Sequence, residues 1–211
     1  MIDLYTWGTP NGKKISIALD EMALPYTVHP VNISNNEQFA SEFLAVSPNN
    51  KIPAIVDRET GDSIFESGAI LMYLGDKTGK LYPADRKTRI RVHEWLMWQM
   101  SAVGPMLGRA HYFLKYNAGK APFAEEWFSV EAKRIYGVLD GLLAKHEFMC
   151  GDYSIVDIAT FPWIARYEWQ RMDLNDFPNV KRWYLAIAAR PAVQKGYKVP
   201  NSTDEIPLPA A

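Results

Sequence analysis

Two polar side chains stand at the start of a predicted helix near the N-terminus, in the segment T-P-N-G at residues 9–12. Thr9 carries a hydroxyl and Asn11 carries an amide, and both groups can donate hydrogen bonds. The first N–H groups of a helix have no partner within it, so this end of a helix favours an anion. The same segment is also an ordinary turn that caps a helix. Its residues therefore fit either a structural cap or a set of donors to a negatively charged atom such as a thiolate.

A second polar pair, Glu66 and Ser67, lies where a predicted strand passes into a predicted helix. In a purely structural role, Ser67 can be the N-cap of that helix. In a binding role, the helix N-terminus offers the N–H and hydroxyl of Ser67 to a carboxylate, and Glu66 can pair with an ammonium group. Both roles use the same geometry, so the pair is a candidate binding site as well as a helix start.

Sulfur and metal chemistry by the chain's own residues are not expected. Cys150 is the single cysteine, which excludes an internal disulfide, a CxxC pair and a thiolate zinc site. We interpret it as a small buried hydrophobic residue. The four histidines, His29, His93, His111 and His146, lie far apart and form no HxH or HExxH spacing. We therefore predict that the protein binds no metal.

The composition is that of a globular protein of 211 residues, with 48% hydrophobic and 22% charged residues. This length fits one large domain or two small ones. The net charge of −1 favours neither nucleic acid nor an anionic membrane as a partner. Apolar runs such as residues 69–74 are much shorter than a membrane span, and the start M-I-D-L-Y-T-W does not resemble a signal peptide. We expect a cytoplasmic protein.

Residues 1–80 are predicted to alternate between strands and helices. Alternating apolar residues predict a strand at 2–6, and apolar residues at helical spacing follow up to Met22. A second strand at 26–31 is interrupted near Pro30, which is typical of an edge strand. After a short helix, P-A-I-V-D and S-I-F-E predict a hairpin, and a final helix ends near Gly79. The order is strand–helix–strand, connector, strand–strand–helix.

From about residue 86 onward, only helices are predicted. The first covers 86–117, and Gly104-Pro105 is expected to kink or break it. A second long helix follows, a capping box of Ser154 and Asp157 opens a third, and Arg190-Pro191 closes a fourth. The pattern predicts an α/β domain at 1–80 and an all-helical domain at 86–197. The proline-rich segment 198–211 is expected to be loose.

Several segments resemble a known family. The order of elements in residues 1–80 is that of the thioredoxin-like fold. The segments S-P-N-N-K-I-P-A-I-V-D, F-E-S-G-A-I-L-M-Y-L and G-D-Y-S-I-V-D-I-A resemble cytosolic glutathione transferases over residues 1–195. T-P-N-G and G-P-M-L-G at 104–108 are most similar to the bacterial Nu class. The resemblance implies a thioredoxin-like α/β N-terminal domain plus an all-α C-terminal domain, with Pro53 cis, in a homodimer.

The resemblance also implies roles for the two polar pairs. Thioredoxin relatives carry CxxC in the loop before the first helix, and this chain has no cysteine there. The sulfur then comes from bound glutathione, a co-substrate, and Thr9 and Asn11 hold its thiolate. Glu66 and Ser67 anchor its γ-glutamyl end.

Four further residues are assigned to glutathione by the resemblance. Ile52 bonds the cysteinyl backbone as in strand addition, beside the cis Pro53. Lys51 lies near the glycyl carboxylate, although it could equally be a solvated loop lysine. Gln38 contacts the same end of glutathione, unless its segment is only a polar turn.

The second substrate is expected at the kinked stretch of the helical domain. We predict that Met106, Arg109 and Tyr112 face the cleft and contact a small disulfide or electrophile. The resemblance to the Nu class implies a glutathione-dependent thiol–disulfide oxidoreductase. Two alternatives stay open at this stage: conjugation of glutathione to electrophiles or peroxide reduction, and a non-catalytic glutathione-binding regulatory module.

Overall fold

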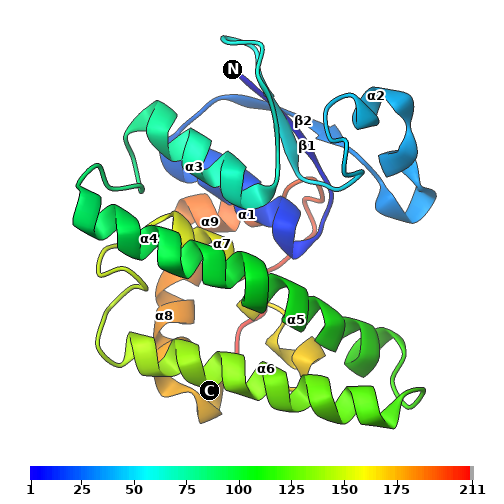
Figure 1. Ribbon diagram of the computed structural model, residues 1–211, viewed down its shortest axis with the longest axis vertical. Coiled ribbons are helices and arrows are strands. Elements are labelled where there is room, and N and C mark those ends of the chain that lie inside the picture. The colour runs from blue at the N-terminus through cyan, green and yellow to red at the C-terminus, as the bar shows by residue number, and fades with distance from the viewer. Residues whose placement is uncertain (210–211) are drawn as a thin grey trace. The chain divides into compact units, whose positions relative to one another are not determined.

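The computed structural model describes residues 1–209, which divide into two compact units (Figure 1). The first unit contains residues 1–84 and 189–206, and the second contains residues 85–188 and 207–209. Within residues 1–209, no helix is both long enough and apolar enough to cross a lipid bilayer.

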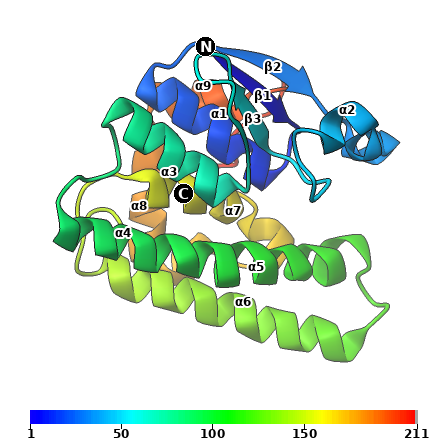
Figure 2. The same ribbon diagram turned by 45° about the horizontal axis from the view of Figure 1, so that its top comes forward.

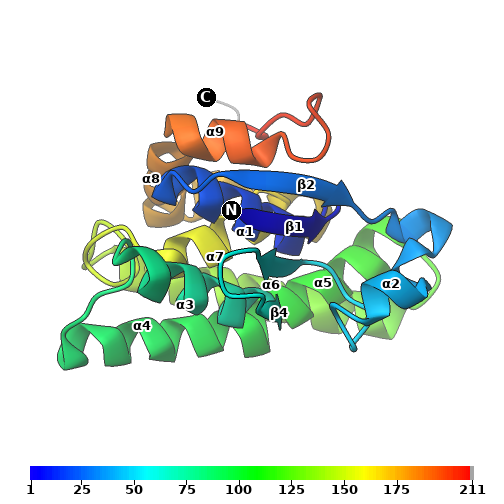
Figure 3. The same ribbon diagram turned by 90° about the horizontal axis from the view of Figure 1, so that it is seen from above.

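The N-terminal unit is built on a four-stranded mixed sheet of order β2-β1-β3-β4. The strands are β1 (Ile2–Thr6), β2 (Tyr26–Pro30), β3 (Ala54–Asp57) and β4 (Ser63–Phe65). β1 pairs parallel with β2 and antiparallel with β3, and β3 and β4 form the predicted antiparallel hairpin. β2 lies at the edge of the sheet, as Pro30 predicted, because proline has no N–H to give to a further strand (Figure 3).

Two main helices of this unit lie side by side, α1 (Pro10–Met22) and α3 (Ser67–Thr78) (Figure 2). A short helix, α2 (Ser41–Leu44), and 3-10 turns at Ile33–Asn35 and Glu37–Phe39 form the connector between β2 and β3. The core is fully buried, with Leu4, Ile15 and Ile55 inaccessible to solvent. The predicted thioredoxin-like order of elements is confirmed.

The C-terminal segment differs from the prediction, which placed residues 86–197 in the helical domain and expected a loose tail at 198–211. Helix α9 (Pro191–Tyr197) instead packs on α1 and belongs to the N-terminal unit. Gly196 permits this contact, because a Cβ there would lie 2.6 Å from the backbone N of Ile17. The tail is held as well, since the buried Lys13 Nζ lies 2.6 Å from Asp204 Oδ2.

The second unit is helical. It comprises α4 (Arg86–Trp98), a π-helical segment (Gln99–Val103), α5 (Gly104–Ala110), a second π-helical segment (His111–Tyr116), α6 (Pro122–Leu143), α7 (Ile155–Ile164), 3-10 turns (Tyr167–Gln170 and Leu174–Asp176) and α8 (Pro178–Ala188). Its described residues contain only isolated bridges, Phe148 to Gly151 and Cys150 to Asp152, and no strand. The predicted all-helical character of this region is therefore confirmed.

Gly104-Pro105 does not break the first helix of this unit. The chain stays helical at Gly104, with φ −58° and ψ −57°, and the Gly104 N–H donates to the Gln99 carbonyl five residues earlier. The wider π-helical turn lies directly before the proline, whose missing N–H and bulky ring would disturb an ordinary α-helical turn. The expected distortion is thus a local widening of the helix before Pro105.

The predicted capping box at the start of α7 is confirmed. The Ser154 hydroxyl accepts from the Val156 N–H at 3.3 Å, and Asp157 Oδ2 accepts from the Ser154 N–H at 2.9 Å. Asp157 Oδ1 also accepts from the Met149 N–H and the Trp183 indole. Burial raises the pKa of this carboxyl group, and the four donors offset part of the cost of burying it.

Candidate active site

A pocket of about 120 Å³ lies in the N-terminal unit, where the loop before β3 meets the starts of α1 and α3. It is lined by Asn11, Ser47, Lys51, Ile52, Pro53, Phe65, Glu66 and Ser67. Six of the residues expected to bind glutathione therefore meet in one place. Thr9 and Gln38, also expected there, do not line it.

Thr9 begins α1 as its N-cap, with an extended backbone at φ −104° and ψ 160°. Its Oγ1 accepts a hydrogen bond from the Gly12 N–H at 3.2 Å. The cap uses the hydroxyl oxygen as an acceptor and leaves its proton available for donation. The structural role of the T-P-N-G segment is therefore confirmed, and donation by Thr9 to a ligand is compatible with it. Asn11, in the first turn of α1, lines the pocket.

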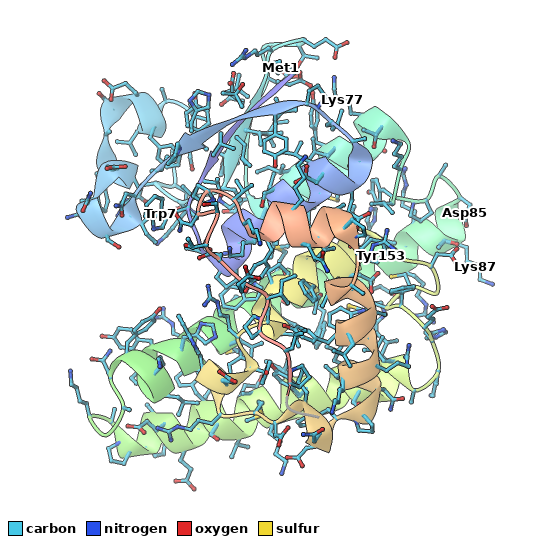
Figure 4. The ribbon with its side chains drawn as sticks, turned by 180° about the vertical axis from the view of Figure 1, so that it is seen from behind. Met1, Trp7, Lys77, Asp85, Lys87 and Tyr153 are labelled. Carbon is cyan, nitrogen blue, oxygen red and sulfur yellow. The ribbon has the colours of Figure 1, made fainter. Side chains whose placement is uncertain are left out.

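Gly12 and Gly8 show how tightly this loop is enclosed. A Cβ on Gly12 would lie 2.2 Å from the Trp7 carbonyl oxygen, so only glycine fits where α1 turns under the loop. A Cβ on Gly8 would lie 2.9 Å from Asn201 Nδ2 of the C-terminal tail, which passes beside the loop that follows Trp7 (Figure 4). The loop that carries Thr9 is thus packed on both sides.

The loop before β3 positions the middle of the pocket. The Ser47 hydroxyl donates to the Lys51 carbonyl at 2.8 Å, and Asn50 adopts a left-handed turn conformation with φ 48°. The Ile52–Pro53 peptide bond is cis, as predicted. Ile52 is buried but lies outside the paired sheet register, which begins at Ala54. Sequence reasoning missed Ser47, although S-P-N-N-K is a turn-forming cluster in which a serine commonly bonds the backbone.

The Glu66–Ser67 junction corrects one prediction. Ser67 is not the N-cap of α3 but its first residue, and Glu66 occupies the N-cap position without a side-chain cap. Glu66 has φ 67°, which is strained for a residue with a side chain, and strain of this kind is often found at functional sites. This backbone leaves the Glu66 carboxylate exposed at the pocket, where Asn49 Nδ2 lies 3.4 Å away.

Lys14 is a residue of this region that sequence reasoning missed. Its side chain is 1% exposed, and its Nζ lies 3.3 Å from the hydroxyl oxygen of Ser67. Burial lowers the pKa of Lys14 to about 7, although the negative charge of Glu66 acts in the opposite direction. Consecutive lysines on a helix are ordinarily exposed, so the sequence carries no signal for this burial.

The other predicted residues lie elsewhere. Gln38 belongs to the 3-10 turn Glu37–Phe39, and within residues 1–209 its buried Oε1 has no hydrogen-bond partner. Met106 and Arg109 lie on α5, and Tyr112 lies in the π-helical segment that follows, all in the helical unit. Arg109 and Tyr112 are exposed to solvent. Their assignment to a second substrate stays a prediction.

Cys150 is poorly suited to act as a nucleophile. It lies in the helical unit and is partly buried, and this burial raises the pKa of its thiol to about 12. The reactive form of a cysteine is the thiolate, so Cys150 stays protonated and unreactive near neutral pH. Within residues 1–209, no three His, Cys, Asp or Glu side chains form a cluster that could hold a metal ion.

The chain is similar to proteins of known activity. It is 45% identical to the disulfide-bond oxidoreductase YfcG of Escherichia coli K12 over 198 residues, covering 91% of this chain and 92% of that protein. It is 36% identical to the disulfide-bond oxidoreductase YghU of the same organism, covering 96% of this chain and 76% of that protein.

Solved structures of similar proteins contain glutathione. A glutathione transferase from Burkholderia graminis with two glutathione molecules per subunit is 44% identical, with a TM-score of 0.88, and covers 95% of this chain and 88% of that one. A glutathione transferase from Pseudomonas putida with one glutathione disulfide per subunit is 40% identical, also with a TM-score of 0.88, covering 95% and 92%.

Two family domains account for most of the sequence. Residues 1–76 match the N-terminal domain of glutathione S-transferases, and residues 105–191 match the C-terminal domain. These ranges include the pocket and most of the helical unit. The chain therefore belongs to the glutathione S-transferase family.

Proposed function

We propose that this protein is a glutathione-dependent thiol–disulfide oxidoreductase, in which bound glutathione reduces an external disulfide. The observation that carries this proposal is the pocket itself. The pocket is lined by Asn11 at the start of α1, by Ile52 beside the cis Pro53, and by the Glu66–Ser67 pair. The relatives named as disulfide-bond oxidoreductases support disulfide reduction, and the glutathione and glutathione disulfide in the related structures support the ligand.

In this proposal, glutathione lies extended across the pocket. The N–H and hydroxyl of Ser67 bind its γ-glutamyl carboxylate at the positive end of α3, and Glu66 pairs with its ammonium group. The backbone of Ile52 bonds the cysteinyl unit, next to Pro53.

At the other end of the ligand, Lys51 is the cation for the glycyl carboxylate. Gln38 is the second group proposed for this end. Because its buried amide oxygen has no partner within residues 1–209, an N–H group of the ligand, such as that of the glycyl unit, could donate to it.

The thiol of glutathione is placed at the start of α1. The hydroxyl of Thr9 and the amide of Asn11 donate to the sulfur, and the helix N-terminus adds positive potential. These donors favour the thiolate, so its population near neutral pH rises. The protein supplies stabilisation and orientation, and glutathione supplies the nucleophile.

The reaction then proceeds in two exchange steps. The glutathione thiolate attacks one sulfur of the disulfide, forming a mixed disulfide and releasing the other sulfur as a thiolate. A second glutathione thiolate attacks the mixed disulfide and releases the remaining substrate thiol. In total, two glutathione thiols are oxidised to glutathione disulfide, one external disulfide is reduced to two thiols, and the protons of the first pair pass to the second.

We further propose a homodimer in the cytoplasm, with Met106, Arg109 and Tyr112 contacting the second substrate. Large apolar side chains on the helical unit support self-association, because monomers rarely leave such groups exposed together. Phe123 is 82% exposed, Val130 is 66% exposed and Trp127 is 50% exposed, and all three lie on α6.

Rates with three substrates test this proposal. Glutathione-dependent turnover should be fastest with a small disulfide such as hydroxyethyl disulfide, and slower with a chloronitrobenzene and an organic hydroperoxide. Cys150→Ala is the control and should leave the disulfide rate unchanged. Preferred turnover of the electrophile or the peroxide would select the conjugating or peroxidase alternative. Binding of glutathione without any turnover would select the non-catalytic module.

A further inference from the structure

Ser47 is buried, although it lines the pocket, and its polar groups fold the loop before β3. Its N–H donates to the Phe43 carbonyl at 2.8 Å, and its carbonyl accepts from the Asn50 N–H at 2.9 Å. Its hydroxyl donates to the Lys51 carbonyl at 2.8 Å. Phe43 belongs to α2 and lies in the same buried hydrophobic cluster as Ile52. Ser47 therefore ties the residue before Ile52 to α2.

The hydrogen bond from Ser47 to Lys51 fixes the peptide group that contains the Ile52 N–H. The Lys51 C=O and the Ile52 N–H belong to one planar trans peptide unit, so they point in opposite directions. Because Ser47 holds the carbonyl, it also sets the direction of the N–H. The peptide plane can turn only if this bond breaks, which would leave a buried hydroxyl without its acceptor.

The backbone of Ile52 is unpaired although the residue is buried. Within residues 1–209, neither its N–H nor its C=O has a hydrogen-bond partner, and the sheet register begins only at Ala54. Ile52 is 9% exposed and lines the pocket. Nearly all buried backbone groups in native proteins are paired, so an unpaired N–H and C=O at a pocket indicate a place for a ligand with matching groups.

A peptide segment has the groups that match this edge. One residue can bond a facing residue through its N–H and its C=O, as in an antiparallel pair of strands. In glutathione the cysteinyl residue has both groups, since its N–H belongs to the γ-glutamyl amide and its C=O to the amide of the glycyl unit. A thiol without that carbonyl would leave the Ile52 N–H unpaired, which lowers affinity.

We propose that Ser47 is a positioning residue of the glutathione site, which holds the Ile52 N–H toward the cysteinyl carbonyl and thereby makes the site selective for peptide thiols. This inference rests on the proposed function, because it assumes that the cysteinyl unit lies along Ile52. Ser47 acts through the Lys51 carbonyl, since its own hydroxyl proton is used within the loop.

Calorimetric titration with three S-methylated ligands tests the proposal, because a blocked sulfur forms no thiolate and leaves only the peptide contacts to be compared. S-methylglutathione and S-methyl-γ-glutamylcysteinamide contain the cysteinyl carbonyl, whereas S-methyl-γ-glutamylcysteamine lacks it. Ser47→Ala should bind the first two ligands about 10-fold more weakly than the wild type does. It should bind the third ligand with the same weak affinity as the wild type.

Ser63→Ala is the matched control. The Ser63 hydroxyl also donates to a carbonyl of this loop, that of Val46, at 3.3 Å. Ser63 is exposed, however, and does not line the pocket. Its replacement should therefore leave the affinities for all three ligands at their wild-type values.

The pattern across the three ligands separates a positioning role from a general loss of structure. Equal losses for all three ligands, or an unchanged affinity of Ser47→Ala for S-methylglutathione, would overturn the inference. If Ser47→Ala does not fold, Ser47→Cys provides the second test, because its S–H is a weaker donor and should cause a smaller loss confined to the two carbonyl ligands. Failure of the wild type to bind S-methylglutathione at all would instead overturn the proposed function.

Discussion

Lys13 and Lys14 are neighbours on α1 and are equally buried, but they face different surroundings. Lys13 lies against α9 and the C-terminal tail, with Asp204 at 2.6 Å and the ring of Tyr197 4.1 Å below its Nζ. Lys14 lies against α3 and bonds the neutral hydroxyl of Ser67. The first side of α1 contains a charge that the fold itself neutralises. The second side contains a charge that burial disfavours, because desolvation lowers the pKa of Lys14 to about 7.

This difference predicts opposite effects of the same substitution on stability. Lys14→Met should stabilise the ligand-free protein at acid pH, because it removes a buried ammonium that burial disfavours. The pKa falls from about 10.5 in the unfolded chain to about 7 in the folded protein, which corresponds to a cost of up to about 5 kcal/mol. Lys13→Met should instead destabilise the protein, because Asp204 loses its partner.

The contribution of Lys14 to the unfolding free energy depends on pH, and its folded and unfolded pKa values fix the direction of the change. Below about pH 7, Lys14 is protonated in both states and its full cost is present. Between about pH 7 and 10.5, only the unfolded state keeps the proton, so the contribution of this group to the unfolding free energy rises with pH. Urea unfolding of the wild type and Lys14→Met across this range measures the difference. A gap that does not shrink as the pH rises would contradict the assignment.

Gly196→Ala tests the packing of α9 on the side of α1 where Lys13 lies. The new methyl group would lie 2.6 Å from the Ile17 backbone, which cannot move as a side chain could, so α9 must shift. We expect a loss of about 2–3 kcal/mol in unfolding free energy. Gly141→Ala, where a Cβ meets nothing within 4 Å, is the control and should be neutral or slightly stabilising. Thermal unfolding of both variants decides the question, and an unchanged midpoint for Gly196→Ala would show that α9 is not held by this contact.

Glu66→Gln tests the proposed binding of glutathione and should have the smallest effect of these substitutions. Glu66 is exposed, so its proposed ion pair with the ammonium group of glutathione forms in a solvated environment. We expect a loss of about 1 kcal/mol, or about 5-fold in affinity, with little change in stability. Equilibrium titration with S-methylglutathione measures it. An unchanged affinity would show that Glu66 does not pair with the ammonium group of the ligand.

Local patterns in the sequence were sufficient for much of the fold and part of the site. The short runs P-A-I-V-D and S-I-F-E, separated by R-E-T-G-D, predicted the hairpin of β3 and β4, and the spacing of Ser154 and Asp157 predicted the start of α7. The cis Pro53 and the pocket residues from Asn11 to Ser67 came from resemblance to a family rather than from local pattern.

Long-range packing was not predictable in the same way. The association of α9 with α1 joins residues far apart in the sequence, such as Ser16, whose hydroxyl donates to the Gly196 carbonyl at 2.7 Å. A proline-rich tail likewise gives no sign that Asp204 will meet a buried lysine. The burial of Lys14 depends on which side of α1 faces α3. The N-cap of α3 was assigned to Ser67 because serine is a favoured cap, but the strained backbone of Glu66 shifts the helix start by one residue.

The pKa of the glutathione thiol in the bound state tests the central claim most directly, since we propose that the start of α1 creates the nucleophile. Thiolate absorbance followed against pH should give a bound pKa about 2 units below that of a free thiol. Thr9→Val should raise it by about 1 unit, and Thr9→Ser, which keeps the hydroxyl, should not. A bound thiol with the pKa of free glutathione in an active wild-type protein would contradict the account.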